Sequence, residues 1–188
     1  MTDADASSPD TLLRSEIVHR GRLLTMRVDT VRLVSGREAG REVVEHPGAI
    51  ALVPLLPDGR VVLVRQWRHA VATMLLEVPA GTREPDEPPE RTAARELTEE
   101  TGYTADRIIP LGALFTTPGF CTEQIHCYLA LGLHAGDASP EDDEGITLEH
   151  LPLADAGAAV ARGDLQDAKS IAALAMAQHY LATYPETL

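Results

Sequence analysis

The sequence has little cysteine and no long apolar run. Its only two cysteines, Cys121 and Cys127, form neither a zinc-binding pattern nor a disulfide framework, so we expect free thiols in a reducing compartment. No apolar run approaches the length that spans a membrane, and residues 2–10 are small and acidic, unlike a signal peptide. These absences favour a cytoplasmic protein with no membrane partner.

Basic residues are also scarce. Lysine and arginine together number 16 against 29 aspartates and glutamates, so the formal net charge is −13. Such an acidic composition disfavours nucleic acid and anionic membranes as partners. A small phosphate-containing ligand is still compatible with it, because a few local arginines can override the overall sign.

The first part of the chain has a β pattern. Residues 1–10 are expected to be a disordered lead. Residues 25–34 alternate apolar and polar side chains and are followed by a turn and a returning strand over residues 41–46. This antiparallel hairpin has few large apolar side chains, so it must pack against the main body or a second copy of the chain. We therefore divide the chain into a lead with an N-terminal β segment over residues 1–46 and one domain over residues 47–188.

In that domain, strands alternate with helices. Several neighbouring strands have connections too short for a parallel crossover, which predicts an α/β fold with a mixed sheet between helices. The expected strands cover residues 49–56, 60–65, 74–78, 108–115, 123–133 and 147–151, and the expected helices cover residues 90–101, 153–162 and 168–184.

The central stretch is GTREPDEPPERTAARELTEETGY, residues 81–103. Prolines before a run of good helix formers, and Gly102 after it, predict one short helix there. On this helix Glu96 and Glu100 share a face, four residues apart. Carboxylates gathered on one face repel each other, and a hard cation such as Mg2+, which prefers oxygen ligands, reverses that effect. A solvated acidic face is the alternative interpretation.

The same stretch fills the fixed positions of the Nudix box, GX5EX7REUXEEXGU with U a bulky apolar residue, and resembles that motif. Tyr103 at the last position departs from the usual aliphatic residue, which concerns packing rather than chemistry. The resemblance implies a Nudix-type α/β/α sandwich that binds Mg2+ or Mn2+ and hydrolyses a diphosphate linked to another moiety. It implies metal ligands at Glu96, Glu99, Glu100 and the backbone oxygen of Ala80, and structural roles for Gly81, Glu87, Arg95 and Gly102. Arg95 and Glu99, four residues apart, are also expected to pair.

Motifs on either side resemble the ADP-ribose pyrophosphatase branch of the Nudix hydrolases. They are Gln66-x-Arg68, Glu77-Val-Pro-Ala-Gly81, Thr117-Pro118-Gly119-Phe120 and Gly163-x-x-x-Asp167-Ala168-Lys169-Ser170. The resemblance implies substrate contacts by Arg41, Arg68, Glu77, Pro118 and Gly119. Without it, the arginines would be surface residues and Pro118-Gly119 an ordinary turn. A guanidinium at the end of a strand aimed at the site nevertheless suits phosphate, which it grips in a fixed fork.

Two further residue groups leave alternatives open. Trp67, the only tryptophan, either stacks on a base or packs in the core, and core packing is the preferred interpretation. The acidic run at residues 141–144 is expected to supply the proton acceptor, because a metal-bound carboxylate is a poor base and a mobile loop can bring another acid to the water. Glu144 is the first choice and Asp142 and Glu141 are reserves; a solvated acid cluster is the alternative.

These features together predict Mg2+- or Mn2+-dependent hydrolysis of ADP-ribose to AMP and ribose 5-phosphate. One alternative is another nucleoside diphosphate sugar or a dinucleotide as substrate. Another is a nucleotide-sugar-binding module that kept the fold but lost turnover. Because relatives in this branch exchange the N-terminal region between subunits, a homodimer is expected, in which Arg41 of one chain reaches the diphosphate bound by the other.

Overall fold

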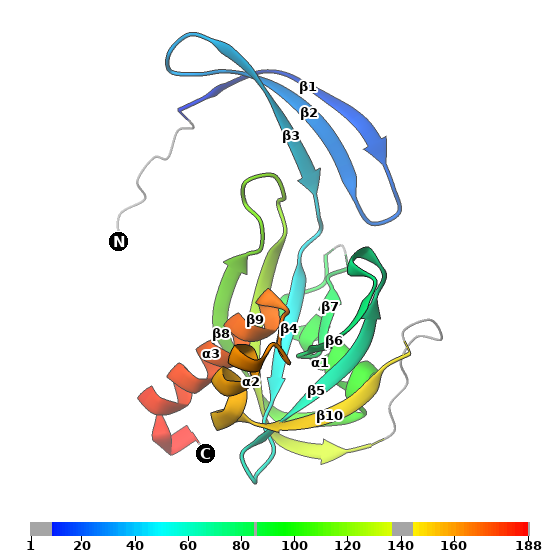
Figure 1. Ribbon diagram of the computed structural model, residues 1–188, viewed down its shortest axis with the longest axis vertical. Helices are drawn as coiled ribbons and strands as arrows, with labels where there is room; N and C mark the ends of the chain where they lie inside the picture. The colour runs from blue at the N-terminus through cyan, green and yellow to red at the C-terminus, as the bar shows by residue number, and fades with distance from the viewer. Residues whose placement is uncertain (1–8, 85, 137–144, 188) are drawn as a thin grey trace. The chain divides into compact units, whose positions relative to one another are not determined.

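The computed structural model describes residues 9–84, 86–136 and 145–187, and they divide into two compact units (Figure 1). The first unit is the chain up to Pro47 together with Thr117–Glu123. The second joins Gly48–Thr116 to the chain from Gln124 onward, and it contains the whole of the stretch at 81–103. Residues 1–8 of the lead that was expected to be disordered lie outside the described residues.

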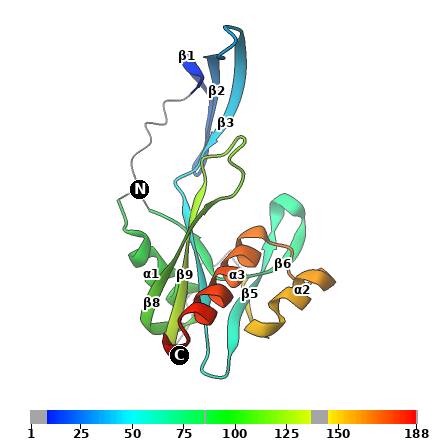
Figure 2. The ribbon, with the colours of Figure 1, turned by 90° about the vertical axis from the view of Figure 1, so that its left-hand side faces the viewer.

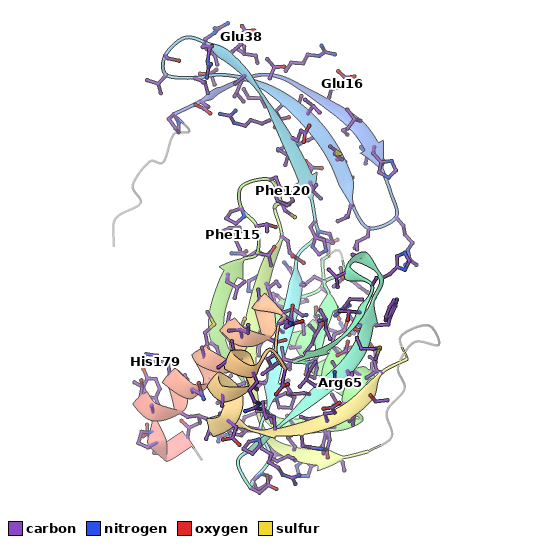
Figure 3. All side chains as sticks on the ribbon, in the orientation of Figure 1. Glu16, Glu38, Arg65, Phe115, Phe120 and His179 are labelled. Carbon is purple, nitrogen blue, oxygen red and sulfur yellow. The ribbon has the colours of Figure 1, made fainter. Side chains whose placement is uncertain are left out.

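The first unit is built on a three-stranded antiparallel sheet. β1 (Thr11–Arg20) pairs with β2 (Thr25–Arg32), which pairs with β3 (Glu38–Glu45). Glu16 of β1 and Glu38 of β3 are labelled on this sheet in Figure 3. The turn between β2 and β3 contains Gly36 at φ +81°, a conformation that glycine adopts without steric cost. The returning strand begins at Glu38, earlier than predicted. β1 adds a third strand to the predicted hairpin and so forms a three-stranded sheet.

A four-stranded mixed sheet is central to the second unit. Its strands, in spatial order, are β7 (Ala80–Thr82), β4 (Ala49–Pro54), β9 (Gln124–Ala135) and β8 (Tyr103–Phe115). β4 is parallel to β9 and antiparallel to β7, and β8 is antiparallel to β9. The predicted mixed sheet is thus confirmed, although the short strand β7 was not expected.

A second, antiparallel sheet was not predicted as a separate element. It places β5 (Arg60–Arg68) between β10 (Thr147–Pro152) and β6 (Thr73–Glu77). The hairpin of β5 and β6 passes through a single 3-10 turn, η1 (His69–Val71). In this antiparallel pair Arg68 is opposite Thr73 and Glu77 is opposite Val64, so Arg68 and Glu77 meet along the hairpin only through their long side chains.

Helices cover both faces of the mixed sheet. α1 (Pro89–Thr101) and α3 (Ala168–Thr183) lie on opposite sides of β9 and β8 in Figure 2. The chain also forms η2 (Leu153–Asp155), α2 (Ala156–Arg162) and η3 (Pro185–Thr187). No helix within the described residues is both long and apolar enough to cross a membrane.

The central strand β4 is buried on both faces, which explains its continuous apolar sequence. Ile50 and Leu52 pack with residues of α1, whereas Ala51 and Val53 pack in a separate cluster with residues of α3. Alternate side chains of a strand point to opposite faces, so β4 is a shared core element of the two layers. The α/β/α sandwich follows from this double burial.

Candidate active site

Helix α1 carries the acidic residues, and its local sequence sets its ends. It begins at Pro89, where a missing N–H costs little. It ends at Thr101 and is capped by Gly102, which lies at φ +72° and whose N–H donates to the Thr98 carbonyl. Leu97 is 1% exposed, and burying a leucine contributes about 1.5–3 kcal/mol, against about 0.3–0.5 kcal/mol for a helical ion pair. Apolar packing therefore holds α1 in place, and its ion pairs orient the carboxylates.

Two carboxylates of α1 lie against strand β7. A Cβ atom on residue 81 would come within 1.9 Å of Cδ of Glu96, so only glycine leaves room for that side chain. Glu100 is 4% exposed and accepts a hydrogen bond from the N–H of Ala80 at 3.1 Å. The glycine of the box is thus needed for a close approach rather than for a turn.

Arg95 is the cation among these carboxylates. Its Nη1 lies 2.8 Å from Oε1 of Glu96 and 2.8 Å from Oε2 of Glu99, and its Nη2 lies 3.3 Å from Oε2 of Glu87. Burial alone would lower the pKa of Arg95, but the bond to Glu87 and the charges of Glu96 and Glu99 outweigh it and raise the pKa. The Thr92 hydroxyl, together with Arg95, holds the pKa of the Glu87 carboxyl below its usual value. The expected Arg95–Glu99 pair is present.

A pocket of about 310 Å³ lies over these residues. It brings together the predicted metal ligands and the arginine predicted to bind phosphate. Its lining consists of Gln66, Arg68, Ala80, Gly81, Thr82, Glu84, Arg95, Glu96, Glu99 and Glu100.

The donor set of this pocket fits a hard divalent cation. Three carboxylates and the carbonyl of Ala80 are oxygen donors, which Mg2+ and Mn2+ prefer. Among the residues that the structure describes, no three acidic, histidine or cysteine side chains form a ready metal cluster, and Arg95 binds Glu96 and Glu99. Mg2+ commonly completes its coordination with water and substrate phosphates, so a few protein ligands suffice.

Arg68 borders the pocket at the end of β5 and is held by a buried carboxylate. Its Nε and Nη2 donate to the two oxygens of Glu77 at 2.8 and 2.6 Å, and the Lys169 ammonium also bonds Glu77. Burial raises the pKa of Glu77, but the bonds and charges of Arg68 and Lys169 lower it more, so the carboxylate is charged. The Glu77 side chain is 1% exposed. Glu77 does not line the pocket, and its predicted contact with a substrate stays a prediction.

Three predicted substrate residues, Arg41, Pro118 and Gly119, belong to the first unit. Arg41 lies in β3, where its Nη1 donates to the Gly40 carbonyl at 3.1 Å and its Nη2 lies 3.5 Å from Asp10. Pro118 and Gly119 lie in the segment Thr117–Glu123. Their contacts with a substrate stay predictions.

The predicted proton acceptors, Glu144, Asp142 and Glu141, lie outside the described residues. Their assignment stays a prediction that rests on the sequence.

Trp67 is 51% exposed, so the core packing expected for it is wrong. It alternates along β5 with Gln66 and Arg68, which line the pocket, so it points to the other face of the strand. Met74, its cross-strand neighbour, is also exposed. The strand ends beyond the core at this point, which composition alone does not reveal.

An acidic helix packed on a glycine-bearing strand, beside an arginine-lined pocket in an α/β/α sandwich, fits the binding of a diphosphate compound together with a divalent cation. The chain belongs to the Nudix hydrolase family. The model of the NUDIX domain matches residues 45–174, and that of the nucleoside diphosphate sugar hydrolase N-terminal domain matches residues 11–44.

Both cysteines are free thiols, as expected.

Similar proteins cover most of the chain. The ADP-ribose pyrophosphatase of Bacillus subtilis (strain 168) is 35% identical over 89% of this chain and 92% of its own. The ADP-ribose pyrophosphatase of Mycobacterium tuberculosis is 39% identical over 91% of this chain and 84% of its own. A GDP-mannose pyrophosphatase of Yersinia enterocolitica is 37% identical over 73% of this chain and 77% of its own. A solved structure of an ADP compounds hydrolase superposes with a TM-score of 0.83 at 24% identity, covering 93% of this chain and 95% of that one, and thus shares the fold.

Sequence reasoning missed several pocket residues. Gln66 was quoted in a motif without a role, although its spacing of two from Arg68 on a strand puts both on one face. Glu84 and Thr82 also line the pocket, and no periodic signal marks them. Lys169 was likewise quoted without a role, and its partner Glu77 lies 92 residues away.

Proposed function

We propose that this protein hydrolyses the diphosphate bond of ADP-ribose to give AMP and ribose 5-phosphate. One observation carries the proposal: a single pocket joins three glutamates of α1 to Arg68. Carboxylates recruit a cation and the arginine binds phosphate, so the pocket suits a diphosphate. The names and long alignments of the ADP-ribose pyrophosphatases support the choice of substrate.

The proposed mechanism assigns a task to each side chain. Glu96, Glu99, Glu100 and the carbonyl of Ala80 would hold Mg2+ or Mn2+, which when bound neutralises diphosphate charge and lowers the pKa of water. Arg68 uses its Nε and Nη2 on Glu77. The other edge of its guanidinium, at Nη1, is then the one that meets a phosphate oxygen in a fixed orientation.

The proposed general base is an acid of the run at 141–144, with Glu144 first and Asp142 and Glu141 as reserves. The base takes the proton of the attacking water, and a carboxylate outside the metal site keeps the basicity for this task. Neutral amide variants at each position, assayed for turnover and for metal affinity, test the assignment. One position is expected to lose rate and retain metal affinity; full activity in all of them contradicts the proposal.

The substrate proposal is tested on a panel of ADP-ribose, ADP-glucose, GDP-mannose and NADH. Product monophosphates are measured by phosphate release with a coupled phosphatase. We expect the catalytic efficiency for ADP-ribose to be at least about tenfold above the others, a difference of about 1.4 kcal/mol in transition-state binding. A preference of that size for another compound would overturn ADP-ribose as the substrate.

Another nucleoside diphosphate sugar is the alternative substrate, favoured by the likeness to a GDP-mannose pyrophosphatase. The carboxylates and Arg68 serve any diphosphate equally. The moiety beyond the diphosphate therefore decides between the two candidates, and the panel includes GDP-mannose for this reason.

We further propose that the protein is a cytoplasmic homodimer joined through residues 1–46. The free thiols are typical of a reducing compartment. All ten residues of β1 are exposed within one chain, including Leu12, Leu13, Ile17 and Val18. Neighbouring side chains of a strand point to opposite faces, so both faces carry apolar groups, and a second chain would bury them.

Replacing Ile17 by aspartate is expected to dissociate the dimer, because a charge would enter an apolar interface. Light scattering should then give the mass of one 20.2 kDa chain instead of two. Val71→Asp is the control, since Val71 is an exposed valine outside residues 1–46. A wild-type protein that is monomeric and fully active would contradict the proposed dimer.

A further inference from the structure

The first turn of α3 contains the only lysine of the chain. Of the 16 lysines and arginines, all but Lys169 are arginine. An ammonium is a compact point charge, whereas a guanidinium is a wide planar fork. Lys169 is also among the less exposed cations, with a side chain 14% exposed. The one lysine of the chain thus lies where a compact cation contacts two carboxylates.

Lys169 lies between two carboxylates. Its Nζ bonds Oε2 of Glu77, the same oxygen that Arg68 reaches at 2.6 Å. Nζ also donates to Oδ2 of Asp167 at 2.9 Å. Asp167 in turn caps α3 by accepting from the N–H of Ser170 at 3.0 Å. Lys169 is therefore anchored by the cap of its own helix and presented to the carboxylate that holds Arg68.

The same helical turn also holds the chain that leads into the box. The hydroxyl of Ser170 accepts a hydrogen bond from the N–H of Val78 at 2.8 Å. Both Ser170 and Val78 are fully buried. The residues between β6 and β7 are thus fixed by α3, and Glu77 has little freedom to follow Arg68 if that arginine moves.

We propose that Lys169 is a positioning residue that prepares Arg68 for a diphosphate by sharing the charge of Glu77. A guanidinium bound to one desolvated carboxylate forms a neutral pair, which attracts an anion weakly. A second cation on the same carboxylate offsets part of its charge, so Arg68 keeps its bidentate orientation and more of its attraction for phosphate. This inference rests on the proposed binding of a diphosphate in the pocket.

The test is a double-mutant cycle of Lys169→Met and Glu77→Gln in the full-length protein. The measured quantities are kcat and KM for ADP-ribose with Mg2+, and the Kd of α,β-methylene-ADP by calorimetry. Lys169→Met is expected to raise KM and Kd about tenfold, the value of one charge-assisted hydrogen bond, with kcat within about twofold of wild type. In the Glu77→Gln background the same change should have no further effect, because Lys169 then has no charge to share. In the double variant Asp167 loses Lys169 but keeps its hydrogen bonds from the N–H and the hydroxyl of Ser170, and thermal unfolding checks that each variant is folded.

Arg162→Met is the control, because Arg162 pairs with Asp164 on the surface and lies outside the pocket. Its kinetic constants should equal those of wild type. An undiminished effect of Lys169→Met in the Glu77→Gln background would overturn the inference, as would a lowered melting temperature with unchanged KM and Kd. If the panel shows that the wild type prefers another nucleoside diphosphate sugar, the proposed substrate fails and the cycle is measured on that compound instead.

Discussion

Glu100→Gln is expected to remove nearly all turnover while leaving the fold intact. Glutamine keeps the size of the side chain, and its carbonyl can still accept the hydrogen bond from Ala80. The change removes the negative charge that a divalent cation requires. We expect kcat to fall at least about a hundredfold, more than is typical of residues that merely orient a metal ligand. Glu96→Gln should have an effect of similar size. Turnover measured across a Mg2+ titration checks both.

Glu90→Gln is the matched control for these variants. Glu90 stands on the same helix but is exposed in its first turn and does not line the pocket. Its turnover should equal that of wild type, and thermal unfolding should show that all three variants are folded. If Glu100→Gln retained a near-normal rate at ordinary Mg2+ concentrations, its assignment as a metal ligand would be wrong.

Gly81→Ala should disable the enzyme through a single methyl group. The new Cβ would overlap the carboxyl group of Glu96, because it would lie only 1.9 Å from Cδ of that side chain. Either the side chain of Glu96 or strand β7 has to move, and both belong to the site. We expect turnover to fall at least about a hundredfold with little change in stability, because the new Cβ meets only the flexible end of the Glu96 side chain. Steady-state kinetics and thermal unfolding measure the two effects.

Gly157→Ala provides the opposite case. Gly157 is exposed in α2, and no atom lies within 4 Å of the position that its Cβ would take. Alanine should therefore raise stability by about 0.5–1 kcal/mol and leave turnover unchanged. Wild-type turnover in Gly81→Ala would mean that Glu96 acts from another position than the one seen against β7.

The sequence predicted best those features whose signals are local. Helix α1 was found to within a residue because proline, helix formers and Gly102 are adjacent in the chain. The proposed metal ligands on it followed from the same 23-residue stretch. The mixed sheet followed from short connections, since these restrict the pairing of neighbouring strands.

Features that depend on distant partners could not be predicted in this way. Three-residue β7 has too short a pattern to be read, and the pairing of β10 with β5 joins strands that are far apart in sequence. Trp67 was expected in the core because tryptophan is mostly apolar, yet its exposure depends on where the second sheet ends. Glu77 is bonded by Lys169 of α3, and no local periodicity in the sequence indicates such a bond.

The solitary lysine also makes local opening of the site measurable by native-state proteolysis. A protease that cleaves after lysine has one peptide bond to attack, between Lys169 and Ser170. That bond lies in the first turn of α3, where Ser170 is 0% exposed, so cutting requires this turn to unravel first. When reclosing is faster than cutting, the cleavage rate reports the population of the opened state. A diphosphate that binds at Arg68 should stabilise the bonds from Arg68 and Lys169 to Glu77 and so make opening of this turn rarer. The intact chain should then survive longer in the protease, which gives a measure of binding that needs no turnover.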